Sequence, residues 1–398
     1  MTVLRVREVP TSGSHRAGAP AEGRRRSPEV ADPDEAAETA ALLVLRCLPG
    51  VGDRTTIRLV EEFGSARRAL EAPTGAFAAW AGKDAARARN DPAVRDRARQ
   101  AEKRARESGV GIVRFGGPAY PPALLQLHDP PPVIFLRGDA SLLDPPAVAV
   151  VGSRKATVYG RRTAETIGGA LARAGIPVVS GLALGIDAAA HRGALAAEGR
   201  VVGVLGAGVD VPHPPANSGL FRIVGRDHLL VSEFLPGERP YPHHFPRRNR
   251  ILAALSSAVV VVEAARRSGA LITVDHAMDL GRDVLAVPGR VDSRTSRGTN
   301  RLLQDGAQVV VDPLRIVELL SMVLGRSQER STATVSVLPA PAGVGGEIWR
   351  ALEGGGLRAD ALARELEMDA GRVLAALSRL EVEGWVEVGP GMTYFRRG

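Results

Sequence analysis

The chain has 398 residues, of which 44% are hydrophobic and 4% aromatic, and a formal net charge of +8. This length allows about two or three domains with real cores, and the positive charge favours an acidic partner. One cysteine, Cys47, excludes an intramolecular disulfide and a cysteine-based zinc cluster. No apolar run approaches the ~18 residues of a membrane span, and the N-terminus lacks the apolar core of a signal peptide. We therefore expect a soluble cytoplasmic protein with no membrane partner.

The first part of the chain divides into an extension and a helical domain. Residues 1–37 are rich in Arg, Pro, Gly, Ser, Ala and Glu without periodicity, which predicts a disordered extension. Residues 38–110 are predicted to be helical, with a PGVG turn at 49–52 between two helices. This is the pattern of a helix-hairpin-helix module, whose hairpin N–H groups can hold a nucleic-acid phosphate. A plain helical turn is the alternative.

Five strand-like apolar runs follow, and each ends in a polar, glycine-bearing or arginine-bearing turn. They are Ala147–Val151, Ile176–Val179, Val201–Leu205, Ala258–Glu263 and Asp283–Val287. Their alternation with helical stretches predicts an α/β domain with a parallel sheet over residues 111–325. Such sheets bind ligands at the carboxyl ends of their strands. Residues 147–313 hold 20 Lys and Arg against 14 Asp and Glu, so most of the positive surplus lies here.

The first of these turns is GSRKATVYG, at 152–160. It matches neither GxxxxGK[ST] nor GxGxxG, so the lysine of an ATPase and the fingerprint of a dinucleotide site are both missing. It offers the hydroxyls of Ser153 and Thr157 and the guanidinium of Arg154, which can bind a phosphate bidentately. The alternative is an ordinary strand-to-helix turn with an incidental arginine.

The second turn, SGLALGID, permits a tight backbone nest at Gly181 and places Asp187 near a helix start. Asp187 and His191 are four residues apart on one helix face and form a conceivable general base pair. Capping and helix packing are the alternative, and we assign no catalytic residue. His243 and His244 lack a third ligand at a supporting spacing, so we expect no metal site.

The segment FPRRNR is the strongest electrostatic signal, because it brings Arg247, Arg248, Asn249 and Arg250 to the start of a predicted helix. Basic groups at a helix N-terminus oppose its dipole at some tenths of a kcal/mol each. That unfavourable arrangement suggests an anionic ligand at this place. The segment RRSGALIT is a second basic segment of this kind, and it contains Ser268 and Gly269.

The C-terminal part is predicted to be a second domain. Residues 326–343 have the composition of a linker, and 344–398 contain three helical patterns followed by two short β-like runs. Three helices and a β-hairpin are typical of a winged-helix domain. Its third helix has only Arg372 and Arg379 as positive charges, so a protein contact and weak DNA binding both stay open.

The ordered motifs, from GSRKATVYG to GTNRLLQDGA at 298–307, closely resemble the DNA-processing protein A (DprA) family over about Pro118 to Pro313. The resemblance implies an extended Rossmann-like domain flanked by a helix-hairpin-helix-like and a winged-helix-like domain. It implies a homodimer that binds and protects single-stranded DNA and loads the RecA recombinase, in natural transformation or recombination. It implies a binding protein rather than an enzyme, with no cofactor.

The expected strand-binding residues combine the resemblance with the chemistry of the loops. They are Gly152, Ser153, Arg154, Lys155, Thr157, Gly181, Arg247, Arg248, Asn249, Arg250, Ser268 and Gly269. One departure is His213, which stands where the family commonly has tyrosine. Arginine loops with few aromatic residues suit sequence-tolerant binding that follows the phosphate backbone.

Two other classes of function remain open at this point. A Rossmann-like nucleotide phosphoribohydrolase also has glycine turns that hold a nucleoside phosphate. That family has a PGGxGTxxE-like motif, whereas this chain has only SGALITVDH near the corresponding place. A pure interaction scaffold would not need several arginine-bearing glycine turns at one edge of a sheet.

Overall fold

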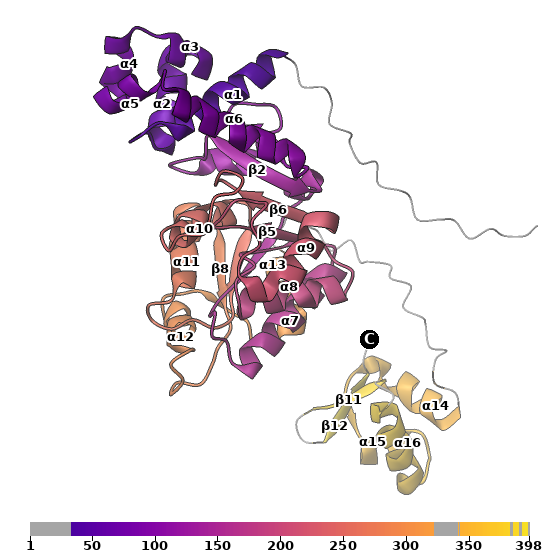
Figure 1. Ribbon diagram of the computed structural model, residues 1–398. Coiled ribbons are helices and arrows are strands. Elements are labelled where there is room, and N and C mark those ends of the chain that lie inside the picture. Colours follow the sequence, from indigo (N-terminus) through magenta and orange to yellow (C-terminus); the bar gives the residue numbers. More distant parts are fainter. Residues whose placement is uncertain (1–32, 322–340, 342, 383–384, 390–391, 397–398) are drawn as a thin grey trace, which may run out of the picture. The chain divides into compact units, whose positions relative to one another are not determined.

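The computed structural model describes residues 33–321, 341, 343–382, 385–389 and 392–396. The described residues form two compact units, one up to residue 321 and one from residue 341 (Figure 1). Of the extension expected at 1–37, residues 1–32 lie outside the described residues, whereas 33–37 begin the first helix. The linker expected at 326–343 also lies outside them, except for residues 341 and 343.

The first unit opens with six helices between residues 33 and 110. They are α1 (Pro33–Cys47), α2 (Asp53–Phe63), α3 (Ala66–Glu71), α4 (Thr74–Ala81), α5 (Lys83–Ala88) and α6 (Pro92–Glu107). The hairpin between α1 and α2 contains Gly50 at φ +71°, a conformation that glycine adopts without strain. Leu43, Leu59 and Phe77 are fully buried, in an apolar core that continues into the sheet domain. This shared core explains why the helical region and the sheet form one unit.

Nine strands form one sheet, in the order β1-β2-β6-β5-β4-β3-β7-β8-β9. They are β1 (Gly111–Arg114), β2 (Val133–Gly138), β3 (Val148–Val151), β4 (Val178–Ser180), β5 (Val201–Val204), β6 (Leu229–Ser232), β7 (Ala258–Val261), β8 (Asp283–Ala286) and β9 (Gln308–Val309). The seven strands from β6 to β9 run parallel, and β1 and β2 extend the sheet in antiparallel fashion. The five apolar runs correspond to β3, β4, β5, β7 and β8, which confirms the predicted Rossmann-like α/β fold.

Helices cover both faces of this sheet, as Figure 1 shows. They are α7 (Val158–Arg173), α8 (Ile186–Ala196), α9 (Ser218–Asp227), α10 (His244–Ala254), α11 (Gly269–Asp279), α12 (Arg297–Gln304) and α13 (Ile316–Leu320). One apolar core joins α7, α8 and α9 to the sheet, and a second joins α10 and α11 to its other face. Within residues 33–321, four short 3-10 helices connect these elements, at Pro122–Gln126, Ala140–Leu143, Pro215–Asn217 and Pro313–Arg315, and a further one, Leu352–Gly354, belongs to the second unit. Strands buried on both faces need continuous apolar sequence, and β3 and β7 consist of Val and Ala alone.

The strand order reverses beside β3, and this reversal positions the candidate site. From β3 the chain proceeds through β4 and β5 to β6 on one side, and from β7 through β8 to β9 on the other. Val151 of β3 pairs with Val261 of β7, which in turn pairs with Ala286 of β8. The loops that follow these three strands therefore start at one edge. Such a switch point leaves a crevice for a ligand outside the carboxyl ends of the strands.

The second unit is a winged helix, as predicted. It contains α14 (Gly343–Ala351), β10 (Leu357–Arg358), α15 (Ala359–Glu365), α16 (Ala370–Val382), β11 (Val386–Gly389) and β12 (Thr393–Arg396). The strands form a small sheet in the order β10-β12-β11. Ile348, Leu362, Val373 and Leu377 are fully buried between the helices and this sheet.

Neither a helix that could cross a bilayer nor a metal-binding group of side chains occurs among the described residues. In that part of the chain, no helix is both long and apolar enough to cross a bilayer. Nor does it contain a group of three or more His, Cys, Asp or Glu side chains that could hold a metal ion.

Candidate nucleic-acid interface

A groove of about 570 Å³ lies at the switch point, between the loops that follow β3 and β7 and the starts of α10 and α11. It brings together eight of the residues expected from the sequence. They are Gly152, Ser153, Arg154, Lys155, Arg248, Asn249, Ser268 and Gly269. Gly181 lines a smaller pocket that adjoins the groove. Thr157, Arg247 and Arg250 do not line either cavity, and the structure gives each of them other contacts.

The loop after β3 is held tightly against the loop after β7. Ser153 N–H donates to the carbonyl oxygen of Glu263 at 2.7 Å. A Cβ on Gly152 would lie 2.8 Å from that same oxygen, so glycine permits this close approach. The Ser153 hydroxyl accepts from Lys155 N–H at 3.1 Å and shapes the turn. As a result, the side chains of Arg154 and Lys155 are exposed at the mouth of the groove.

Thr157 is part of the scaffold of this loop. It is the N-cap of α7, where its hydroxyl accepts from Gly160 N–H at 3.0 Å. The same hydroxyl donates to the Glu263 carboxylate at 2.6 Å, and Thr157 N–H donates to it at 2.9 Å. Because these bonds occupy both the hydroxyl and the N–H, Thr157 shapes the loop and has no free donor for a strand.

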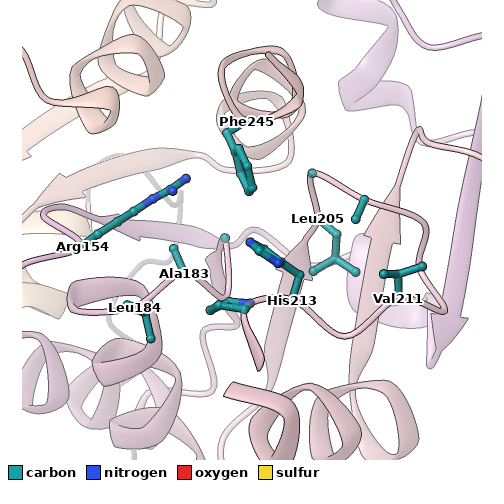
Figure 2. Close-up of a pocket in the computed structure, with 11 residues that line it drawn as sticks. Arg154, Ala183, Leu184, Leu205, Val211, His213 and Phe245 are labelled. Carbon is teal, nitrogen blue, oxygen red and sulfur yellow. The ribbon is translucent and has the colours of Figure 1, made fainter. Parts of the chain in front are cut away.

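A pocket of about 70 Å³ opens beside the groove, and Figure 2 shows its walls. Phe245 reaches into it from α10, and the guanidinium of Arg154 lies over the ring at 4.5 Å from its centre. The ring of His213 faces Phe245 with 5.7 Å between the two centres. Burial and the nearby Arg154 lower the pKa of His213, which favours the neutral imidazole. The pocket therefore combines an apolar floor, one aromatic wall and one cation.

Arg248 lies beneath the groove and is 4% exposed. Its guanidinium donates to the carbonyl oxygens of Gly181, at 3.0 Å, and Val204, and its Nε donates to the Asn249 side chain at 2.9 Å. A Cβ on Gly181 would lie 2.0 Å from the guanidinium, so a larger residue there would displace the Arg248 side chain from this position. Burial lowers the pKa of Arg248 to about 10, which still leaves it charged at neutral pH. Arg248 thus acts as a fixed positive charge under the groove floor.

Asp187 and His191 do not form a general base pair. The Asp187 carboxylate accepts from Gly181 N–H at 3.1 Å, and burial raises its pKa. His191 is fully buried, which lowers its pKa to about 3, and it does not line the groove. The capping and packing alternative is therefore the one that the structure supports.

The start of α11 forms the opposite wall of the groove. Ser268 is its N-cap, and the Asn249 side chain donates to the Gly269 carbonyl at 3.1 Å, which ties α10 to α11. No atom within 4 Å faces the Cβ position of Gly269. The partly positive end of this helix, which has 11 residues, is therefore open toward the groove.

Arg247 and Arg250 belong instead to a largely buried group that we call the interdomain cluster, in which Arg247 is the most exposed member. It consists of Arg46, Asp53, Glu233, Arg247 and Arg250. Arg250 Nη2 lies 3.1 Å from Asp53 and 2.7 Å from Glu233, and Arg247 Nη2 lies 2.9 Å from Glu233. Arg46 and Arg247 also bind the Asp53 carboxylate directly. The anion expected at the start of this helix is thus supplied by the protein itself, from α2 and from the end of β6.

The two carboxylates of the cluster have pKa values that are shifted in opposite directions. Burial raises the pKa of Glu233 to about 7. Burial alone would raise the pKa of Asp53 too, but Arg46, Arg247 and Arg250 together hold it below its usual value. Of the three arginines of FPRRNR, only Arg248 lines the groove. The expectation that all three form one phosphate anchor is not supported by this arrangement.

Phe245 is the residue that the sequence reasoning missed. It belongs to FPRRNR, lines both cavities and stacks with Arg154. Its position directly before the arginines, in a chain with few aromatic residues, was the available signal.

Comparisons with known proteins give the family. The family model described as DNA recombination-mediator protein A matches residues 111–321, and the DprA winged helix domain matches 333–392. The DNA processing protein DprA of Streptococcus pneumoniae is 46% identical over 191 residues, 48% of this chain and 67% of that protein. Protein Smf of Synechocystis is 33% identical over 317 residues, 70% of this chain and 78% of that protein.

The fold agrees with these sequence matches. The X-ray structure of DprA from Streptococcus pneumoniae superposes with a TM-score of 0.59 at 35% identity, covering 71% of this chain and 96% of that one. The winged-helix match falls on the second unit described above, and the recombination-mediator match falls on the sheet that carries the groove. This chain belongs to the DprA family.

Proposed function

We propose that this chain binds single-stranded DNA along the groove, by its phosphate backbone and without reading base sequence. The observation that carries the proposal is the pair of Arg154 and Phe245 at the junction of groove and pocket. An exposed cation stacked on a half-buried aromatic ring offers neighbouring contacts to a phosphate and to a base.

The charges of the groove support a polyanionic ligand. Arg154 and Lys155 are exposed at its mouth, and Arg248 is fixed beneath its floor. Among the residues that line the groove, the one carboxylate is Asp187, which is bound to backbone N–H and whose pKa is raised. The start of α11 adds a partly positive helix end. Together these groups favour several phosphates along a path.

The pocket supports a single strand over a duplex. At about 70 Å³ it admits no more than one base at a time. Bases of a duplex are stacked and paired, whereas bases of a single strand are free to turn toward an aromatic wall. Binding of this kind tolerates any sequence, because every base has a flat face for stacking.

Protection of the bound strand, transfer of that strand to the RecA recombinase, and action as a homodimer are the finer parts of this proposal. Their support is membership in a family described as recombination mediators. The measurement is RecA filament assembly on single strands coated with single-strand-binding protein. We expect the chain to speed assembly and to slow nuclease digestion of the strand.

The binding proposal is tested by fluorescence anisotropy with labelled single-stranded and duplex oligonucleotides of equal length. We expect the single strand to bind more tightly, with an affinity that falls as salt rises. A parallel arm measures release of base from AMP, the reaction of a nucleotide phosphoribohydrolase. Base release without DNA binding would contradict the proposal and favour that enzyme.

A further inference from the structure

A second group of cations lies beside the groove, on the loops around β3, β7 and β8. We call it the β8 rim and define it as Lys155, Tyr159, Arg266, Arg267, Arg294 and Arg297. Lys155 belongs to the groove as well, and Ala265 and Ser268, which flank Arg266 and Arg267, also line it. The rim therefore begins where the groove ends.

Backbone hydrogen bonds join the three loops that carry the rim. The loop after β7 accepts from Ser153 N–H at 2.7 Å on one side and from Gly298 N–H at 2.7 Å on the other, through Glu263 and Ala264. Tyr159 Oη donates to the Pro288 carbonyl at 3.4 Å, which brings the start of α7 to the loop after β8. Neighbouring strands are about 5 Å apart, so the loops form one continuous surface rather than three separate ones.

The cations of the rim have no carboxylate partner among the described residues. Within residues 33–321, the side chains of Lys155, Arg266, Arg267, Arg294 and Arg297 make no ion pair, and all five residues are exposed. Carboxylates are available nearby: Arg290 pairs with Asp292 at 2.8 Å and Arg301 with Asp305 at 2.8 Å, in the same loop and the same helix. The absence of ion pairs at these five described residues is therefore not caused by a local shortage of carboxylates.

Exposed apolar surface is interleaved with the cations. Tyr159 is 56% exposed, Val158 is 73% exposed and Val291 is 89% exposed. Basic groups alternating with an exposed aromatic ring are what a surface for single-stranded nucleic acid requires, because phosphates bind the cations and a base stacks on the ring. A small anion would need converging cations, whereas these are distributed over three loops.

We propose that the β8 rim is a second segment of the strand path, which holds nucleotides that leave the groove toward β8. This proposal rests on the function proposed above. The phosphates contact the arginines of the loops after β7 and β8, and Tyr159 provides the stacking surface between them. Figure 1 shows β8, α11 and α12, the elements from which this segment extends.

The test compares strands of different length, from about 4 to about 16 nucleotides, the range of site sizes of single-strand-binding domains. The variants are Arg294→Ala with Arg297→Ala, and Arg266→Ala with Arg267→Ala. The charge-matched control is Arg222→Ala with Arg226→Ala, which removes two exposed cations from α9. Melting temperatures of all variants verify that the fold is retained.

We expect both rim variants to bind the shortest strand like the unaltered protein. Their affinity for the longest strand should fall about tenfold at low salt, and the slope of log affinity against log salt should flatten by ~0.7 for each phosphate that the variant no longer binds. The control should change neither. Tyr159→Phe should retain binding of long strands, and Tyr159→Ser should weaken it.

Two results would overturn the proposal. If the rim variants bind long strands with unchanged affinity and slope, the strand does not cross the rim. If they weaken short and long strands equally, the cations act only by general attraction. Both leave single-strand binding in place, whereas no binding at any length would overturn the proposed function itself and the rim with it.

Discussion

The groove and the interdomain cluster both contain arginines, but the arginines of the two regions have different partners. In the cluster, Arg247 and Arg250 are paired with Asp53 and Glu233, carboxylates of the same protein. In the groove, Arg154 is exposed and its contact is an aromatic ring. The comparison shows that arginine density does not by itself indicate a ligand. What indicates a ligand is a cation whose negative partner the protein does not supply.

The largest expected effect comes from breaking the cluster. Asp53→Ala leaves Arg46 without the carboxylate it contacts, Arg247 with Glu233, and Arg250 with Glu233 and the half-exposed Asp129. Loss of one partner in a buried ion pair lowers the free energy of unfolding by about 3–5 kcal/mol. Urea unfolding of the two proteins measures the difference, with Arg226→Ala as an exposed control expected within about 0.5 kcal/mol. An equal stability for Asp53→Ala and the control would show that the cluster does not hold the fold together.

The cluster should also make stability depend on pH, with a sign set by Glu233. Its pKa is raised to about 7 from a usual value of 4.5 by burial, so the folded state binds this proton more tightly than the unfolded state does. The contribution is fully present below pH 4.5 and is lost as pH rises to about 7. Unfolding of the native protein and of Glu233→Gln at several pH values isolates it. We expect the native protein to lose stability relative to the variant between these limits, and parallel pH profiles would contradict the assignment.

The aromatic wall of the pocket, Phe245, should affect the affinity for DNA and leave the interdomain cluster unchanged. Phe245→Ala removes the ring on which Arg154 stacks, and base stacking on one aromatic side chain contributes about 1–3 kcal/mol. We expect the affinity for single strands to fall by that amount and the affinity for duplex to change little. Tyr241→Ala, which removes an exposed ring just before α10, is the matched control. Equal losses of affinity for single-stranded and duplex DNA would show that the pocket does not bind a base.

Thr157→Ala tests whether Thr157 stabilises the loop or contacts the strand. The threonine caps α7 and binds Glu263, so its loss should lower the free energy of unfolding by about 1 kcal/mol. Because its hydroxyl is already bonded, the salt dependence of strand binding should not change. A flatter salt slope would return Thr157 to the set of strand contacts.

Much of the fold follows from local sequence, because a strand buried on both faces needs a continuous apolar run and its turn needs glycine. β3, β4, β5, β7 and β8 were predictable for this reason. The loops that line the groove were also predictable, since consecutive parallel strands end at one edge. The pairing of Arg247 and Arg250 with Asp53 was not predictable, because Asp53 lies almost 200 positions earlier in the chain and no local pattern indicates such a pairing.

Arg154 gives the most direct test of the central claim, that the groove binds a strand by its phosphates while the cluster holds the fold. The measurement is single-strand affinity over a salt series for Arg154→Ala and Arg250→Ala, with melting temperatures of both. We predict that Arg154→Ala flattens the slope of log affinity against log salt by ~0.7 with little change in melting temperature. Arg250→Ala should lower the melting temperature and keep the slope of the native protein. An unchanged slope in Arg154→Ala, or a flattened one in Arg250→Ala, would contradict the account.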